Sequence, residues 1–155
     1  RYLRPQSDLL TLYAFQAFEP RRYTRHAATT SGLRYPDRMP NTTTAQTATW
    51  TKARLERQYA AVTRFQRTHR ISSSRVVVSS FGAHRLADGV VGYLSHLTEI
   101  FHEHGWHRFF SCYRSPEKPQ YDLEFGTRID SKTRSLNTLW KVLQKDMTRA
   151  KGVRF

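Results

Sequence analysis

The chain has 155 residues, with 26 Lys and Arg against 12 Asp and Glu, which gives a formal net charge of +14. Such a field attracts polyanions, so the candidate partners are RNA, DNA or an anionic membrane surface. Cys112 is the single cysteine, which excludes an intrachain disulfide and the class of disulfide-stabilised secreted domains.

The first 49 residues are predicted to form a basic N-terminal helix followed by an extended tail. Ser7 and Asp8 suit the start of a helix over 7–18, and Pro20 is expected to end it. Residues 20–49 contain three prolines and many hydroxyl side chains but no apolar period, so we expect them to be unstructured. Two interpretations stay open for this tail: an extension that folds on RNA, or a flexible linker.

The segment 50–69 is predicted to be an amphipathic helix. At about 100° per residue, its apolar side chains fall on one arc, which consists of Leu55, Tyr59, Val62 and Phe65. The other side is basic and consists of Lys52, Arg57, Arg64, Arg67 and Arg70. A solvated charged face usually carries both signs, whereas this one is almost purely positive, so we favour contact with phosphates.

Residues 50–155 are predicted to form one compact α/β domain. The patterns indicate a buried strand over 75–82, a helix over 86–104 ending at Gly105, a hairpin of 106–114 with 120–128, a helix from Asp130 or Ser131 to Met147, and a short last strand over 151–155. The order β-α-β-β-α, with an optional final β, predicts an α+β fold, a split β-α-β (ferredoxin-like) two-layer sandwich.

Residues that could carry catalysis or bind metal are gathered between 96 and 124. The metal candidates are His96, Glu99, His102, Glu103, His104, His107 and Cys112, but their spacing matches no recognised ligand motif, so we interpret them as a polar helix end. Cys112 lies in no nucleophile motif. Asp122 and Glu124 are interpreted as the solvent face of the hairpin or as partners of Arg128. We therefore expect no enzyme, no metal, no cofactor and no small-molecule substrate.

In composition the chain resembles mitochondrial ribosomal proteins, which are small and Arg-rich and carry a basic extension on an α/β body. The resemblance implies a structural RNA-binding component of a ribosome in the mitochondrial matrix, with rRNA and neighbouring ribosomal proteins as partners and no homo-oligomer of its own. The expected phosphate contacts are Arg21, Arg22, Arg25, Arg34, Arg38, Lys52, Arg57, Arg64, Arg67 and Arg70. The alternative is a basic accessory subunit of a mitochondrial membrane complex. Direct membrane contact is not favoured, because the apolar arc is modest.

Overall fold

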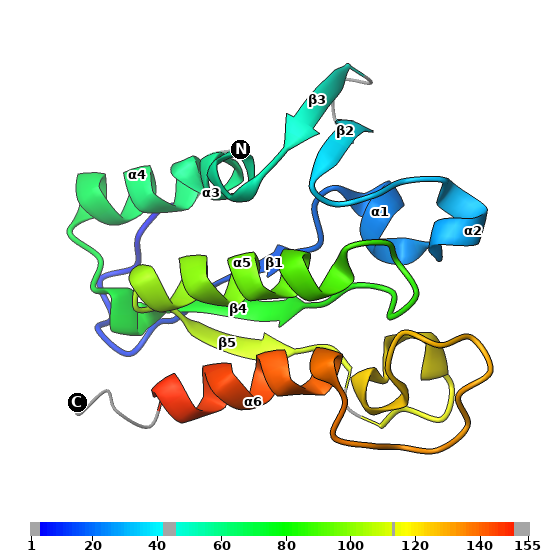
Figure 1. Ribbon diagram of the computed structural model, residues 1–155. Coiled ribbons are helices and arrows are strands. Elements are labelled where there is room, and N and C mark those ends of the chain that lie inside the picture. Colours follow the sequence, from blue (N-terminus) through cyan, green and yellow to red (C-terminus); the bar gives the residue numbers. More distant parts are fainter. Residues whose placement is uncertain (1–3, 42–45, 113, 151–155) are drawn as a thin grey trace.

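A parallel sheet of three strands organises the part of the chain that the structure describes. The computed structural model describes residues 4–41, 46–112 and 114–150. Strand β1 (Tyr13–Ala17) pairs with β4 (Val76–Phe81), and β4 pairs with β5 (His107–Phe110), in both cases in parallel. The spatial order β1-β4-β5 therefore follows the chain (Figure 1).

Helical connections join the successive strands, as parallel pairing requires. Between β1 and β4 lie α1 (Arg21–Arg25), α2 (Ala28–Ser31), the antiparallel pair β2 (Asp37–Pro40) and β3 (Thr47–Trp50), α3 (Lys52–Gln58), α4 (Ala60–His69) and the 3-10 turn η1 (Ser73–Arg75). After β4 come α5 (Val90–Glu103), β5, the 3-10 turns η2 (Pro119–Tyr121) and η3 (Leu123–Phe125), and α6 (Thr138–Ala150). The described chain is thus built from three consecutive strand–helix units.

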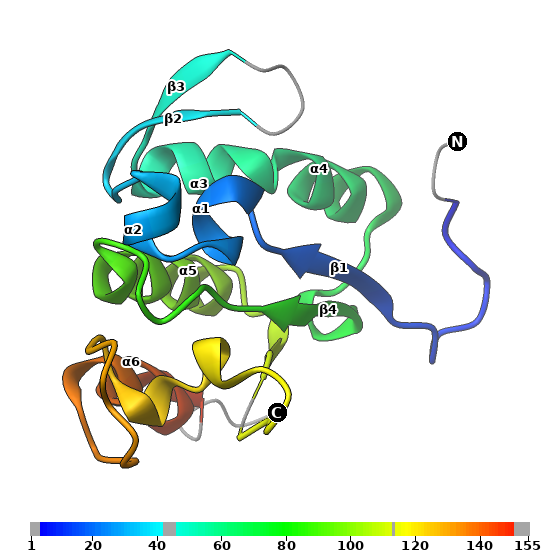
Figure 2. The same cartoon turned by 90° about the vertical axis from the view of Figure 1, so that its right-hand side faces the viewer.

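The helices pack against one face of the sheet, and the apolar core lies between them (Figures 1 and 2). Phe81 of β4 meets Phe101 of α5 with ring centroids 5.3 Å apart. Phe15 of β1 meets Trp106 at 5.2 Å in an edge-to-face contact, a favoured arrangement of aromatic rings. Ala14, Gln16 and Ser79, which alternate with this buried set, are exposed, whereas Val77 is buried.

The segment 7–18, predicted as a helix, contains strand β1 instead. Tyr13 is buried whereas Ala14 and Gln16 are exposed, which is the two-residue period of a strand. Leu9, placed on the apolar face of the expected helix, is 79% exposed. A short apolar run fits either period, so the local sequence does not decide between them.

The segment 20–49, predicted to be unstructured, is folded over the residues that the structure describes. Its large apolar side chains Tyr23, Tyr35 and Met39 are at most 2% exposed. The indole nitrogen of Trp50 donates to the Met39 carbonyl at 3.3 Å, which fixes the β2–β3 pair. The elements of this segment are each four or five residues long, too short for an apolar period to appear.

The predicted hairpin of 106–114 with 120–128 is wrong. Strand β5 pairs with β4 and not with the segment after it, which forms η2 and η3. Asp122, expected on a solvent face, is 2% exposed. A ferredoxin-like sandwich needs antiparallel neighbours in a split order, so the parallel order β1-β4-β5 contradicts the predicted fold. The expected strand over 151–155 lies outside the described residues.

Three predicted elements are confirmed. The helix over 50–69 is present as α3 and α4, with Leu55 and Tyr59 of its apolar arc buried. The strand over 75–82 is β4, and the helix over 86–104 is α5, which begins at Val90. The last helix, α6, begins at Thr138, later than predicted.

Candidate functional site

The carboxyl ends of the three parallel strands meet at one edge of the sheet, and the loops that follow them gather there. In Figure 1 this edge is on the right, where α1 and α2 follow β1 and the two 3-10 turns follow β5. A cleft of about 500 Å³ opens at this edge, lined by Gln16, Phe18, Arg25, Ser111, Cys112, Lys118, Gln120 and Tyr121. The cleft is therefore built from segments that are far apart in the sequence.

Main-chain hydrogen bonds between the loops hold the cleft in shape. The His84 amide, just after β4, donates to the Thr24 carbonyl of α1 at 2.7 Å, and the next amide, Arg85, donates to the Gln120 carbonyl of η2 at 2.8 Å. The Ser111 amide donates to the Phe81 carbonyl at 2.9 Å and continues the pairing of β4 with β5. All three strand ends are thus tied together, which gives the lining residues fixed positions.

A close backbone approach at Gly82 brings the ends of β4 and β5 together. A Cβ atom at this position would lie 2.4 Å from the Ser111 carbonyl oxygen, so a larger residue would push the two strand ends apart. The ring of His84 meets that of Tyr121 at 6.1 Å and adds a side-chain contact between the same two loops.

The charges that line the cleft are positive. Arg25 and Lys118 are exposed, and within the described residues neither forms an ion pair. Burial raises the pKa of Tyr121, with the charge of Arg25 acting in the opposite direction. Burial, followed by the charges of Arg85 and His26, lowers the pKa of His84. The described lining contains no Asp or Glu.

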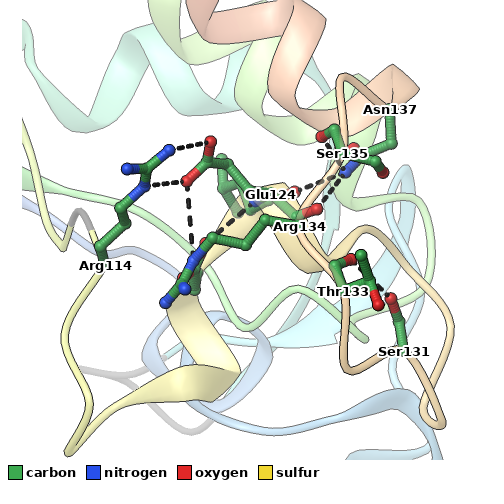
Figure 3. A network of polar contacts seen from close by, with 9 residues as sticks. Arg114, Glu124, Ser131, Thr133, Arg134, Ser135 and Asn137 are labelled. Atoms are coloured by element: carbon green, nitrogen blue, oxygen red, sulfur yellow. Dashed lines mark hydrogen bonds and ion pairs between the residues drawn. The ribbon is translucent and has the colours of Figure 1, made fainter.

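Two carboxylates near this edge, those of Asp122 and Glu124, already have arginine partners, and Figure 3 shows Glu124 between Arg114 and Arg134. Glu124 accepts two hydrogen bonds from the Arg114 guanidinium, and Asp122 accepts one from Arg134 at 2.9 Å. The hydrogen bonds from Arg114 lower the pKa of Glu124. The expected pairing with Arg128 is wrong, since that guanidinium binds Asp130. These contacts join η3 to Arg114 before it and to Arg134 in the loop after it. Both carboxylates are therefore already paired with arginines.

The basic residues predicted to bind phosphate do not converge. Those on α3 and α4 and at the end of α4 are exposed and lie away from the cleft: Arg57, Arg64, Arg67 and Arg70. Arg34 pairs with Asp88, and Lys52 pairs with Glu99 and Glu103 of α5. Arg21 pairs with Glu19, Arg22 is exposed on α1, and Arg38 is exposed on β2. Of the residues predicted to bind phosphate, Arg25 lines the cleft.

The histidine-rich helix end has partners of its own. His96 shares a hydrogen bond of 2.8 Å with the Tyr35 hydroxyl, and His104 stacks on Trp106 with centroids 4.4 Å apart. Among the described residues no three His, Cys, Asp or Glu side chains are grouped to hold a metal ion. None of the described helices combines the length and apolarity that crossing a bilayer would need.

Comparison with known proteins gives a structural likeness without a family. No family model and no curated protein matches the chain. Among solved structures the chain is similar to an endoglucanase (TM-score 0.63, 13% identity, 91% of this chain and 42% of that chain). It is also similar to Thermotoga maritima Cel5A in complex with cellobiose (TM-score 0.61, 13% identity, 90% of this chain and 42% of that chain). A third similar structure is a glycoside hydrolase (TM-score 0.60, 16% identity, 87% of this chain and 41% of that chain).

These likenesses show the fold alone: the parallel strands of this chain and their helices resemble part of the barrel of those structures. The chain spans about two fifths of the length of those structures. The expectations of a ribosomal RNA-binding protein and of a chain without enzymatic character are contradicted, since the structural neighbours are glycoside hydrolases. The mitochondrial location stays a prediction.

Sequence reasoning missed most of the lining of the cleft. Gln16, Gln120 and Tyr121 carry no charge and belong to no motif, so nothing local marks them. The signal that could have found them is their position: Gln16 lies near the end of β1, and Gln120 and Tyr121 lie in the loop that follows β5. Ligands bind at such strand ends and in the loops that follow them in folds of this kind.

Proposed function

We propose that the chain forms the saccharide-binding wall of a barrel of glycoside-hydrolase type. The observation that supports this proposal is the position of the cleft at the carboxyl ends of parallel strands, where barrel enzymes bind their substrates. Two of the similar solved structures are complexes with cellobiose and with mannotriose. A short saccharide is therefore the ligand class to test first.

The lining of the cleft suits a sugar. Gln16 and Gln120 carry amides, which both donate and accept hydrogen bonds, as adjacent sugar hydroxyls do. Phe18 and Tyr121 add ring surface beside these amides. The lining combines these two rings with polar and charged side chains, and polar groups that converge on a site fix the orientation of a small molecule.

The edges of the sheet support a larger barrel. Strands β1 and β5 are the outer strands of the described sheet, and closure into a barrel is the arrangement that removes such edges. Phe109 of β5 is 63% exposed, and Met147 of the neighbouring α6 is 48% exposed. In the proposed assembly the next strand–helix unit covers these side chains.

The proposal assigns binding to this chain and the acid–base pair to the opposite part of the barrel. Glycoside hydrolysis uses two carboxyl groups roughly 5–9.5 Å apart on either side of the scissile bond. The described lining of the cleft has neither Asp nor Glu, and Asp122 and Glu124 are held by arginines. What this wall contributes is the position and orientation of the sugar, which lowers the entropic part of the barrier.

Calorimetric titration of the full chain with cellotriose and mannotriose tests the proposal. We expect binding of at least one of them, and a loss of about 2- to 12-fold for Gln16→Ala, because a hydrogen bond contributes about 0.5–1.5 kcal/mol. Gln16 is exposed, so the variant should fold. The control is Gln144→Ala on the exposed surface of α6, which should bind as the unaltered chain does.

Three outcomes count against the proposal. The absence of binding to both sugars, or an equal loss in the Gln16 and Gln144 variants, would overturn it. Release of reducing ends from cellotriose by this chain alone would contradict the placement of the acid pair on the opposite part of the barrel.

A further inference from the structure

We infer that the cleft takes an acidic saccharide, one whose units carry carboxylates. This inference rests on the proposed function and names the class of sugar that the site would select. Its basis is the set of charged side chains that line the cleft, which consists of Arg25 and Lys118.

The two cations enter the cleft from different segments. Arg25 is the last residue of α1, which follows β1, and Lys118 comes directly before η2, which follows β5. Cations on two loops can contact two successive acidic units, or two oxygens of one unit. A cluster of cations on a single helix would present no such enclosure.

No carboxylate among the described residues neutralises the two cations. Within the described residues neither Arg25 nor Lys118 forms an ion pair. Elsewhere in the molecule the guanidinium of Arg114 and that of Arg134 are paired with carboxylates. A cleft lined by one sign of charge focuses the electric field and attracts ligands of the opposite sign. Such a field does not favour the binding of a neutral sugar.

The backbone that carries Arg25 is held in place. The Thr24 hydroxyl donates to the Phe18 carbonyl at 2.7 Å, and the Thr24 carbonyl accepts from the His84 amide. Tyr23 is fully buried, so the two residues that precede Arg25 both anchor α1. A guanidinium on a fixed backbone suits a carboxylate, because its planar fork donates two parallel hydrogen bonds.

Lys118 stands on a similarly ordered turn. Its amide donates to the Ser115 carbonyl at 3.2 Å, and its carbonyl accepts from the Tyr121 amide at 3.0 Å. The Tyr121 ring, which lines the cleft, therefore has a set position relative to the lysine's backbone. Tyr121 offers a ring face and a hydroxyl, the two features that a sugar ring with a charged substituent uses.

The experiment compares an acidic sugar with its neutral counterpart. The full chain is titrated with trigalacturonate and with the same trisaccharide after reduction of its carboxyl groups to alcohols. We expect the acidic form to bind about tenfold more tightly, since hydrogen bonds to charged groups are about twice as strong as neutral ones. The preference should decrease as salt rises, because exposed charges are screened.

Variants separate the site from the overall charge of the chain. Arg25→Gln and Lys118→Gln should each weaken the acidic sugar by about fivefold or more and the neutral sugar by less than about twofold. The control is Arg22→Gln, because Arg22 is exposed on the same helix and does not line the cleft. It should leave both affinities within about twofold.

The outcomes distinguish this inference from the proposed function. Equal binding of the acidic and the reduced sugar overturns the inference and leaves the proposed function standing. Absence of binding to cellotriose and mannotriose overturns the proposed function itself and this inference with it. An equal loss for Arg22→Gln and Arg25→Gln, or equal competition by polyaspartate, would show attraction of any polyanion and would also overturn the inference.

Discussion

Replacing Asp146 by asparagine tests the contact that joins α6 to the sheet. Arg108 of β5 donates two hydrogen bonds to the Asp146 carboxylate, at 2.7 and 2.6 Å. The two side chains are 12% and 10% exposed. An amide in place of the carboxylate can accept one of these hydrogen bonds, but it leaves the charge of Arg108 without a counter-ion where little water reaches it.

The expected loss of stability follows from this burial. Removing one partner of a buried ion pair costs about 3–5 kcal/mol. Because the amide keeps part of the hydrogen bonding, we expect Asp146→Asn to lower the free energy of unfolding by about 2–4 kcal/mol. Domains of this size are stable by about 5–15 kcal/mol, so the loss is a large fraction of the total.

Urea unfolding gives the free energy of unfolding directly, and a second ion pair provides the control. Arg128 donates two hydrogen bonds to Asp130, at 3.2 and 2.9 Å, but these side chains are 80% and 64% exposed. We expect no measurable loss for Asp130→Asn, because water screens the pair and solvates each partner alone. Equal losses in the two variants would refute the reasoning that burial decides the contribution.

Further predictions concern two glycines and one carboxylate. Gly89→Ala should destabilise the fold by at least about 2 kcal/mol, since φ is +74° and a Cβ atom would lie 1.7 Å from the Tyr35 carbonyl oxygen. Gly92→Ala should stabilise the fold by up to about 1 kcal/mol, because a Cβ atom there meets open space. Urea unfolding of both variants checks the contrast. The lowered pKa of Glu124 predicts stability that is present above its unfolded pKa of about 4.3 and lost as pH falls through the folded value. Urea midpoints of Glu124→Gln should fall less steeply with acid than those of the unaltered chain, and an equally steep fall would contradict this.

The helices that could be predicted from the sequence are those with a long apolar period. The α4 and α5 helices have 10 and 14 residues, enough for side chains to recur on one face several times. Strand β4 could be predicted because three consecutive valines, which are apolar and β-branched, favour a buried strand. What these elements share is that neighbours in sequence determine them.

The fold depended on pairing between distant segments, which no local pattern contains. Tyr13 of β1 lies opposite Val76 of β4, and Val77 lies opposite His107 of β5. The β5 segment was given an antiparallel neighbour because the chain turns after it, and a turn between two apolar segments favours a hairpin. A parallel partner leaves no such mark, since the connection between parallel strands is long.

The candidate site followed the fold, so most of it could not be predicted. Arg25 was predicted as a binding residue from its charge. Gln16 and Gln120 were not predicted as binding residues, because a single amide in the sequence indicates no function by itself. Charge also directed the interpretation toward a surface of arginines. The exposed residues Arg64 and Arg67 of α4 belong to that surface and take no part in the cleft.

Net charge and a charged site make different physical demands. A net charge of +14 accelerates encounters with any polyanion wherever the charges lie, and it implies nothing about fold or reaction. A site requires that charges converge, as Arg25 and Lys118 do on a cleft whose described lining has no carboxylate. Since Arg22 offers the same charge on the same helix outside the cleft, the difference between Arg22→Gln and Arg25→Gln measures position alone. A difference in affinity for an acidic sugar would therefore assign the function to the site, because the two variants have the same composition.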